Sequence, residues 1–511
     1  MQQKKLTLLF LFFALFVSAA MGQRTVTGTV TEADGMPMVG VSVLVKGTTT
    51  GTTTDLDGGF SIEVEDNAVL EFSYIGYTSK EVNVGNRTAL SVTLDPDTEV
   101  LDEVVVIGYG TTAKKDLVSS VSQVKGEELA NQPVARIDQA LQGRATGVEV
   151  ISNNGAPGAA ATIRIRGTNS INGNVNPLFV VDGFIAGTGF NLNNINVNDI
   201  ESIEILKDAT ALSIYGTRGA AGVVIITTKN GSKVKGGKPQ ISLNQYYTTQ
   251  QVANEIEVLG GSGYANYLNE AGQFVAGPDG FGFTDTSLPL VFDDPENATN
   301  TDWLDLVTTT GQILNTDLSI TGSSDKVNYY VSLNRFDQEG LIENSGIERY
   351  TFRNNLDVKI NDKLTTGIRL NISRFRRENN KVNYAQIIGS VLPTRSVFDD
   401  DGNYTATNPV SASLQRNPVA DYNLRVDHAL TTNIVSNIYL EFEPIKNLKL
   451  KTSAGIELNS NKNNFYLPGE LPERKTDNAG GFARVSNNRS NSILNENIAT
   501  YKIEFNKHKF D

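Results

Sequence analysis

From residue 239 onward, apolar and polar side chains alternate with a period of two, which is the period of a β-strand. The clearest run is 349–360, whose apolar residues share one face: Tyr350, Phe352, Leu356, Val358 and Ile360. The same alternation predicts further strands at 241–251, 314–320, 327–333, 364–372, 434–442, 448–458 and 499–505. Eight strands of about ten residues, each with one apolar face, are typical of a transmembrane β-barrel, although a large soluble sandwich also alternates.

The lengths of the connections favour the barrel. Long or medium connections, at 252–311, 337–348, 376–430 and 461–491, alternate with short ones at 322–325, 361–362, 444–447 and 506–507. Outer-membrane barrels have tight turns on one side and longer loops on the other. We therefore expect a membrane-spanning sheet whose long loops all lie on the same side.

The early part of the chain, 24–94, predicts a small all-β domain. Alternating runs lie at 25–31, 39–46, 60–64, 68–74, 79–84 and 90–94, with turn clusters between them, and this spacing indicates a sandwich. The loop Asp55-Leu56-Asp57-Gly58 suggests either a hairpin turn or a calcium loop. Because it lacks the downstream bidentate glutamate, we interpret it as a turn.

Between these regions lie a linker and a mixed segment. Residues 96–115 carry the apolar island Val104–Ile107, which is either one more strand of the sandwich or a strand that adds to a partner's sheet edge. Residues 199–231 predict a strand, a short helix and a second strand. Asp208 can cap this helix at its start, and Gly216 can end it in the left-handed conformation.

Composition limits the chemistry. The net charge of −13 argues against a nucleic-acid partner, and the absence of cysteine excludes disulfides and thiolate metal sites. The two histidines are too far apart for a metal or catalytic cluster, so we expect no catalytic residue, metal or cofactor. The first residues combine Lys4-Lys5, an apolar run at 6–17 and small residues up to Gly22, which predicts a secretory signal peptide over 1–22 and an exported protein. No other stretch suits a transmembrane helix.

Three stretches carry a family resemblance. Residues 199–231, DIESIEILKDATALSIYGTRGAAGVVIITTKNG, resemble the end of the plug domain of TonB-dependent outer-membrane transporters, in particular the SusC/RagA branch. The likeness covers the plug, and its motif residues here are Arg164, Arg166, Gly167, Asp182, Gly183, Lys207, Asp208, Tyr215, Gly216, Arg218 and Gly219. Residues 47–64 resemble a carboxypeptidase-regulatory-like domain. The string DEVVVIGYG looks like the TonB box: Asp102, Glu103, Val104, Val105, Val106, Ile107, Gly108 and Tyr109.

The resemblance implies an all-β-dominated chain. Its expected parts are a signal peptide (1–22), a β-sandwich (23–95), a linker with the TonB box (96–115), a mixed α/β plug (116–231) and a partial barrel (239–511). Plugged barrels have about 22 strands, so eight predict the N-terminal part of a longer protein. Arg164 and Arg166 are expected to face carboxylates of the barrel wall, whereas the sequence alone is equally compatible with solvated charges. Asp182-Gly183 is interpreted as a turn.

The function implied by the resemblance is active import of an oligomeric nutrient across the outer membrane. A glycan is the first candidate and an oligopeptide, as for RagA, is the alternative. The implied partners are an inner-membrane TonB complex, a SusD-like surface lipoprotein and outer-membrane lipid. A passive porin or adhesin stays open, as does a secreted enzyme, although no catalytic constellation is present.

Overall fold

The structure is a computed structural model that describes residues 24–32, 35–48, 50–65, 67–74, 77–95, 104–107, 110–113, 121–130, 136–152, 154–168, 170, 175–232, 234, 238–254, 256–276, 282–284, 291–379, 384–406, 415–476, 479–505 and 508–510. The expected signal peptide lies outside these residues. The chain forms two compact units, one of Met1–Val104 with Ala113–Asp116 and the other of Val105–Thr112 with Leu117–Asp511. Among the described residues, no helix is both long and apolar enough to cross a membrane.

The first unit contains a β-sandwich. Its strands are β1 (Arg24–Thr31), β2 (Ser42–Val45), β3 (Gly51–Thr53), β4 (Gly59–Val64), β5 (Val69–Ser73), β6 (Lys80–Asn83) and β7 (Ala89–Thr93). They form two sheets, in the orders β4-β1-β7 and β3-β2-β5-β6, around an apolar core that includes Val26, Phe60 and Phe72. The sandwich prediction is confirmed, although β3 was missed because its three residues are too short to show alternation.

The strands β8 (Val104–Ile107) and β9 (Gly110–Ala113) form a two-stranded sheet that lies mostly in the second unit, and a small α/β domain follows. Its elements are β10 (Val121–Lys125), α2 (Gly126–Ala130), α3 (Ile137–Leu141), β11 (Val148–Ser152), β12 (Ala161–Ile165), β13 (Leu178–Val181), β14 (Phe184–Gly187), η2 (Leu192–Asn194), η3 (Val197–Asp199), β15 (Ile200–Leu206), α4 (Ala209–Leu212), η4 (Ser213–Gly219) and β16 (Val223–Thr228). The sheet order is β10-β15-β16-β13-β14, with β11 and β12 as a separate hairpin.

The predicted strand–helix–strand segment is present as β15, α4 and β16. The helix is shorter than expected, because it ends at Leu212 and continues as the 3₁₀ turns of η4. Gly216, with φ 59° and ψ −148°, breaks the helical path. This conformation is open to glycine and strained for other residues, which explains why the chain turns here.

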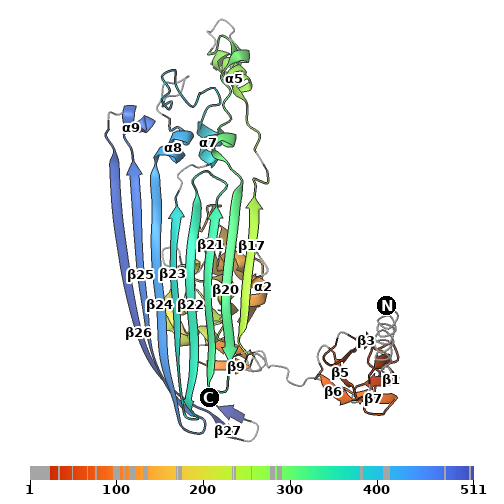
Figure 1. Cartoon of the computed structure of the whole chain (residues 1–511). Helices are drawn as coiled ribbons and strands as arrows, with labels where there is room; N and C mark the ends of the chain where they lie inside the picture. Colours follow the sequence, from red (N-terminus) through yellow and green to blue (C-terminus); the bar gives the residue numbers. More distant parts are fainter. Residues whose placement is uncertain are drawn as a thin grey trace, which may run out of the picture. The chain divides into compact units, whose positions relative to one another are not determined.

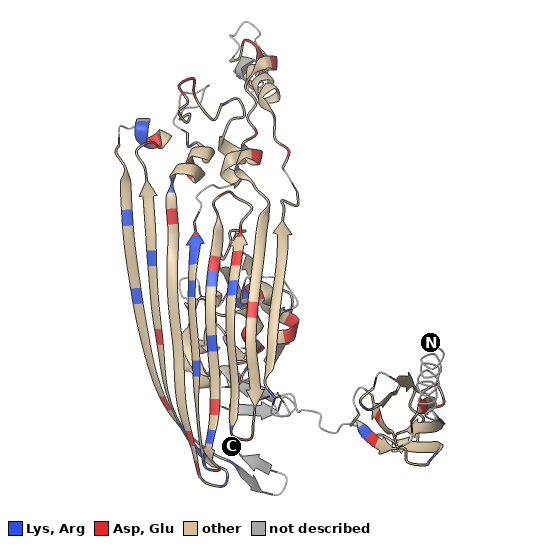
Figure 2. Ribbon diagram, viewed as in Figure 1, with Lys and Arg blue, Asp and Glu red and all other residues tan. Residues whose placement is uncertain are grey.

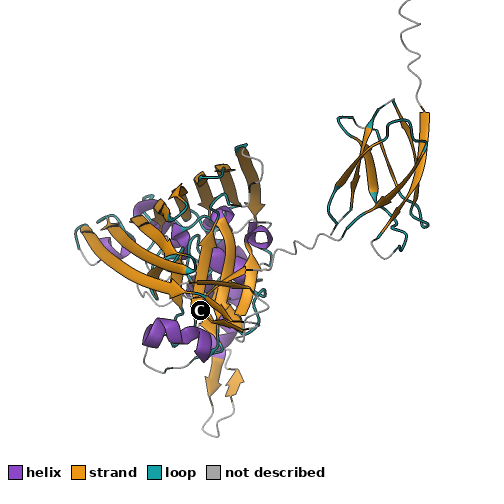
Figure 3. Cartoon of the chain, turned by 90° about the horizontal axis from the view of Figure 1, so that it is seen from below, coloured by secondary structure: helices purple, strands orange, loops and turns teal. Residues whose placement is uncertain are grey.

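A single sheet of eight antiparallel strands forms a tall curved wall, and the plug lies on its concave side (Figures 1 and 3). In spatial order the strands are β17 (Gln240–Gln250), β20 (Gly311–Ser323), β21 (Val327–Glu339), β22 (Gly346–Asn361), β23 (Leu364–Glu378), β24 (Val426–Ile445), β25 (Leu448–Leu467) and β26 (Phe482–Tyr501). Each strand pairs with its neighbour in sequence order within this sheet. The predicted number of strands and their up-and-down order are confirmed.

The position of the eighth strand was predicted wrongly. Residues 499–505 do not form one strand, because β26 ends at Tyr501 and a separate hairpin follows, β27 (Ile503–Phe505) with β28 (His508–Phe510). The expected long loop 461–491 is instead mostly strand, since β25 runs to Leu467 and β26 begins at Phe482. Main-chain hydrogen bonds hold this polar extension together, so it needs no apolar face.

The connections at one end of the wall carry the remaining elements (Figure 1). These are α5 (Gly261–Gln273), β18 (Phe274–Ala276), β19 (Gly282–Thr284), η5 (Pro295–Asn297), α6 (Trp303–Val307), α7 (Tyr384–Ser390), α8 (Pro418–Leu424) and α9 (Pro472–Thr476). Trp303, Val307, Ile387 and Val419 form an apolar cluster that joins α6, α7 and α8. The loops are therefore packed against one another.

The two faces of the wall are reversed relative to a soluble sheet. On β22, the polar side chains Thr351, Arg353 and Asn355 are buried against the plug, while Tyr350 of the other face is exposed. Ile438 of β24 points outward and is 53% exposed. A soluble sandwich would bury its apolar face, so this arrangement fits a sheet whose outer face meets lipid.

Candidate functional site: a polar lock between plug and wall

Arg353 is the centre of the contact between plug and wall. It lies on the inner face of β22 and is only 1% exposed. Its Nη1 donates to Asp182 Oδ2 and to Thr228 Oγ1 over 3.0 Å each, and its Nη2 donates to Asn371 Oδ1 over 3.1 Å. Its Nε lies 3.5 Å from Asp199 Oδ2. One wall guanidinium thus contacts two carboxylates of the plug. We call Asp182, Asp199, Thr228 and Arg353 the lock.

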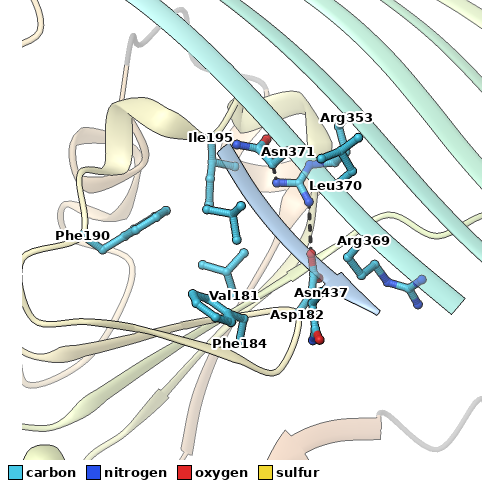
Figure 4. Close-up of a pocket in the computed structure, with 11 residues that line it drawn as sticks. Val181, Asp182, Phe184, Phe190, Ile195, Arg353, Arg369, Leu370, Asn371 and Asn437 are labelled. Carbon is cyan, nitrogen blue, oxygen red and sulfur yellow. Dashed lines mark hydrogen bonds and ion pairs between the residues drawn. The ribbon is translucent and has the colours of Figure 1, made fainter. Parts of the chain in front are cut away.

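Asp182 reaches the wall from the tip of the β13–β14 hairpin (Figure 4). Asp182 and Gly183 have φ values of 49° and 83°, as a two-residue type I′ turn requires, so the turn expected at this position forms. The Asp182 carboxylate also accepts from the Thr228 backbone N–H over 2.8 Å and from the Thr228 hydroxyl over 2.7 Å. These bonds hold the carboxylate at the end of β16, where Arg353 meets it.

Asp199, the second carboxylate of the lock, is fully buried. Its Oδ1 accepts from the Tyr330 hydroxyl over 2.9 Å and from the Ser332 hydroxyl over 2.6 Å, and both donors lie on the inner face of β21. A buried charge is costly unless it is paired and hydrogen-bonded. Two hydroxyls and the Arg353 guanidinium provide these partners here. Asp199 therefore joins the plug to two adjacent wall strands.

Amide side chains extend the polar contact beyond the lock. The η2 residue Asn194 accepts from Asn371 through its backbone oxygen over 2.9 Å and from Ser373 through its side chain over 3.1 Å. Asn355 donates to Thr228 Oγ1 and to the Lys229 backbone oxygen over 2.7 Å each. Because each such bond has a small net free energy, about 0.5–1.5 kcal/mol, they can break and re-form one at a time.

Apolar contacts complete the interface. A Cβ at Gly455 of β25 would lie 2.5 Å from Cδ2 of Phe184, so the plug ring packs directly on the wall backbone. Val435 of β24 belongs to the apolar core of the plug. Beside them, Phe184, Asp182 and Arg353 line a cavity of about 20 Å³, room for about one water molecule (Figure 4).

Arg166 has an ion-pair partner within the plug, and its expected contact with a wall carboxylate stays a prediction. Its Nη2 lies 2.5 Å from Asp208 Oδ1, so this partner is a plug carboxylate. Arg166 follows the end of β12 with φ 56°, and this left-handed turn takes it off the strand face that carries Arg164. Arg164 lies in register with Glu149 of β11. In the lock, by contrast, the wall supplies the cation and the plug supplies the carboxylates.

Two of the remaining plug-motif residues, Lys207 and Tyr215, are buried in the domain. Lys207 donates to Ser122 over 2.5 Å and also to Thr146, and burial lowers the pKa of its amine. The side chain of Tyr215 is buried and that of Arg218 is exposed.

Two glycines of the motif have specific backbone roles. A Cβ at Gly219 would lie 3.2 Å from side-chain atoms of Tyr215 and Val223, so a side chain there would require these neighbours to shift by a few tenths of an ångström. Gly167 has φ 89°, in the region that favours glycine.

Part of the expected TonB box is placed. Val104–Ile107 form β8, which pairs with β9, and in the described residues this sheet has two strands. One edge of β8 is therefore unpaired in the part of the chain that the structure describes. Asp102, Glu103, Gly108 and Tyr109 lie outside the described residues. Within the described ranges, no group of three or more histidine, aspartate or glutamate side chains could hold a metal ion.

Sequence reasoning missed most of the lock. Arg353 was assigned correctly to the polar face of its strand, but no pattern indicated its partners. Asp199 was noted only as the start of a segment. The Asn-rich run 191–198, which supplies contacts to the wall, was not singled out, and its density of side-chain amides is the signal that could have revealed it.

Comparison with known families matches two regions. Residues 113–223 match the TonB-dependent Receptor Plug Domain, and residues 26–106 match the CarboxypepD_reg-like domain. The first region contains Asp182 and Asp199 of the lock. The second contains the sandwich.

Curated relatives match nearly the whole chain. The chain is 42% identical to TonB-dependent receptor P26 of Formosa agariphila over 490 residues, covering 96% of this chain and 48% of that protein. It is 34% identical to TonB-dependent receptor SusC of Bacteroides thetaiotaomicron over 491 residues, covering 88% of this chain and 46% of that protein. The chain thus spans about half the length of the curated relatives it matches.

Solved structures agree. The RagAB peptide importer in its open-open state superposes with a TM-score of 0.65 and 28% identity, over 79% of this chain and 47% of that chain. Its closed-closed state gives a TM-score of 0.62 and 27% identity, over 76% of this chain and 46% of that chain. The sandwich, the plug and the inside-out wall agree with these matches, and the chain belongs to the SusC-like family of TonB-dependent receptors.

Proposed function

We propose that this chain takes part in TonB-dependent active import of an oligomeric nutrient across the outer membrane. The observation that carries the proposal is a plug domain fastened by polar contacts to the inner face of a wall whose outer face is apolar. A passive pore needs no plug, and an adhesin needs no lock. The chain's role is binding and movement, without covalent chemistry.

The lock suits a plug that must be both held and released. Arg353 pairs with two buried plug carboxylates, and moving the plug away would leave these charges without a partner, which typically costs about 3–5 kcal/mol. The amide contacts of Asn194 and Asn355 are single hydrogen bonds, which water can replace as the plug moves. We propose that TonB adds a strand to the free edge of β8 and pulls on the segment before β10, an edge strand of the plug sheet.

For the cargo and its co-receptor we propose an oligosaccharide and a SusD-like surface lipoprotein, since SusC is among the relatives. An oligopeptide is the second candidate, because the chain superposes on the RagAB peptide importer. Cells that carry the whole receptor can be given labelled oligosaccharide or labelled oligopeptide in separate uptake assays. Uptake of the peptide but not the glycan would overturn the preferred cargo and leave TonB-dependent import standing.

Val105→Pro in β8 tests energy coupling. Proline removes a backbone donor and fixes φ, so strand addition to TonB should fail. Val105→Thr is the matched control, because threonine is β-branched and keeps the N–H. We expect Val105→Pro cells to bind substrate at the surface but to import none, while Val105→Thr cells import normally. Normal import by a correctly inserted Val105→Pro receptor would refute the proposal.

A further inference from the structure

A groove of about 360 Å³ lies on the outer face of the wall, over β20–β23. Its floor is one row of apolar side chains that are in register across the four strands: Leu318, Leu333, Phe352 and Ile372. Leu333 is 54% exposed, so the groove is open to the surroundings of the receptor. Its volume and apolar floor suit a hydrocarbon chain.

The next row along the same strands closes one end of the groove. It consists of Thr316, Arg335, Tyr350 and Arg374, again in register. Arg335 and Arg374 flank Tyr350 on either side, about 10 Å apart at the backbone, which is two strand spacings. The Arg335 guanidinium lies 5.9 Å from the centre of the Tyr350 ring. The apolar row of the floor is thus followed directly, on the same face, by a row that contains two arginines with a tyrosine between them.

The two arginines differ in their partners. Arg335 is held by Asp337 over 3.1 Å and by Glu348 over 3.3 Å. Arg374 is exposed and has no ion-pair partner among the described residues. Figure 2 shows Lys and Arg segments beside Asp and Glu segments on the neighbouring strands β21–β23. Arg374 is therefore the cation beside the apolar floor that can bind an anion.

We propose that this groove binds a phosphate-bearing membrane lipid, with an acyl chain over Leu333 and Phe352 and the phosphate on Arg374. The inference rests on the membrane placement in the proposed function. Guanidinium groups pair well with phosphate, and tyrosine and arginine gather where an apolar surface meets the headgroup region. Arg335, held by its two carboxylates, positions Tyr350 at the closed end of the groove, beside Arg374.

Lipid retention tests the proposal. The whole receptor is purified in detergent and offered dimyristoyl phosphatidic acid, dimyristoylglycerol or inorganic phosphate, and bound species are counted by native mass spectrometry. The wild-type receptor should retain one phosphatidic acid and neither of the other probes. Arg374→Gln should weaken retention about tenfold, as expected for the loss of one charge-assisted hydrogen bond.

Two further variants separate the acyl and phosphate contributions. Leu333→Trp fills the groove while leaving Arg374 in place, and it should also weaken retention. Arg376→Gln is the matched control, because Arg376 also faces outward on β23 but pairs with Glu378 over 2.7 Å and does not line the groove. It should retain lipid like the wild type.

Equal retention by Arg374→Gln and the wild type, or binding of inorganic phosphate as tightly as phosphatidic acid, would overturn the lipid site. A receptor that inserts and imports substrate but retains no lipid would refute this inference alone. A receptor that fails to insert would refute the proposed function.

Discussion

Arg353 of the wall and Asp182 of the plug are 171 positions apart in the chain, yet the guanidinium donates to the carboxylate over 3.0 Å. The pair is buried. Arg353 also contacts Asp199 and donates a hydrogen bond to Thr228. The wall therefore supplies the cation and the plug supplies the anions. Loss of the cation would leave two carboxylates together without compensation, and the plug would be loosened.

The first prediction concerns Arg353→Met. The chain has no cysteine, so a single Val435→Cys at the buried interface can report plug movement by its rate of maleimide labelling in outer membranes. We expect Arg353→Met to speed labelling at least tenfold, because breaking a buried ion pair costs about 3–5 kcal/mol. Arg369→Met is the control, since Arg369 pairs with the wall residue Asp357 over 2.7 Å. Equal labelling in both variants would contradict the lock.

The second prediction uses the close contact of Gly455 with Phe184. Gly455→Leu should destabilise the assembled receptor by at least about 1–3 kcal/mol, because the new side chain overlaps the ring. Adding Phe184→Ala should recover part of this loss, so the two changes should not be additive. Thermal unfolding followed by heat-modifiability on gels measures both effects. Gly389→Leu, where a Cβ meets no heavy atom within 4 Å, is the control. Strict additivity would argue against the contact.

The third prediction tests the outer face. Ile438→Arg places a charge on the exposed apolar side of β24 and should cost about 2–4 kcal/mol near the bilayer midplane. Ser453→Arg is the matched change, since Ser453 pairs with Tyr439 on the adjacent strand and shares the inner face with Gly455. Membrane fractionation should show much less inserted Ile438→Arg receptor. Equal insertion of both would indicate a soluble sheet.

The fourth prediction concerns the sandwich, which has its own core. Expressed alone, residues 24–95 should fold and unfold cooperatively in urea. Thr54→Val should cost about 1–3 kcal/mol, because the buried Thr54 hydroxyl accepts from Val41 N over 2.9 Å and donates to Met38 O over 2.5 Å. Thr29→Val, on the exposed face of β1, should change stability by less than about 0.5 kcal/mol. A non-cooperative transition would contradict an independent domain.

The alternation of apolar and polar residues predicted correctly which side chains share a face of the wall, but it predicted the ends of the strands poorly. Tyr350 and Arg353 were placed on opposite faces correctly, because successive side chains of any strand point in opposite directions. Phe482–Asn491, in contrast, was assigned to a loop. It carries polar residues on both faces, and the ladder to β25 is made by backbone groups that have no sequence signal.

The sequence by itself determined which side chains share a face, because the period of a strand is a property of the backbone. It also determined the family, through the residues of the plug and the sandwich. Only the tertiary structure decided that Asp182 and Asp199 meet Arg353, and that Arg166 turns back to Asp208. Ion-pair partners depend on the distance and direction of side chains after folding. Residues separated by more than a hundred positions, such as Asp182 and Arg353, acquire that geometry only when the plug packs against the wall.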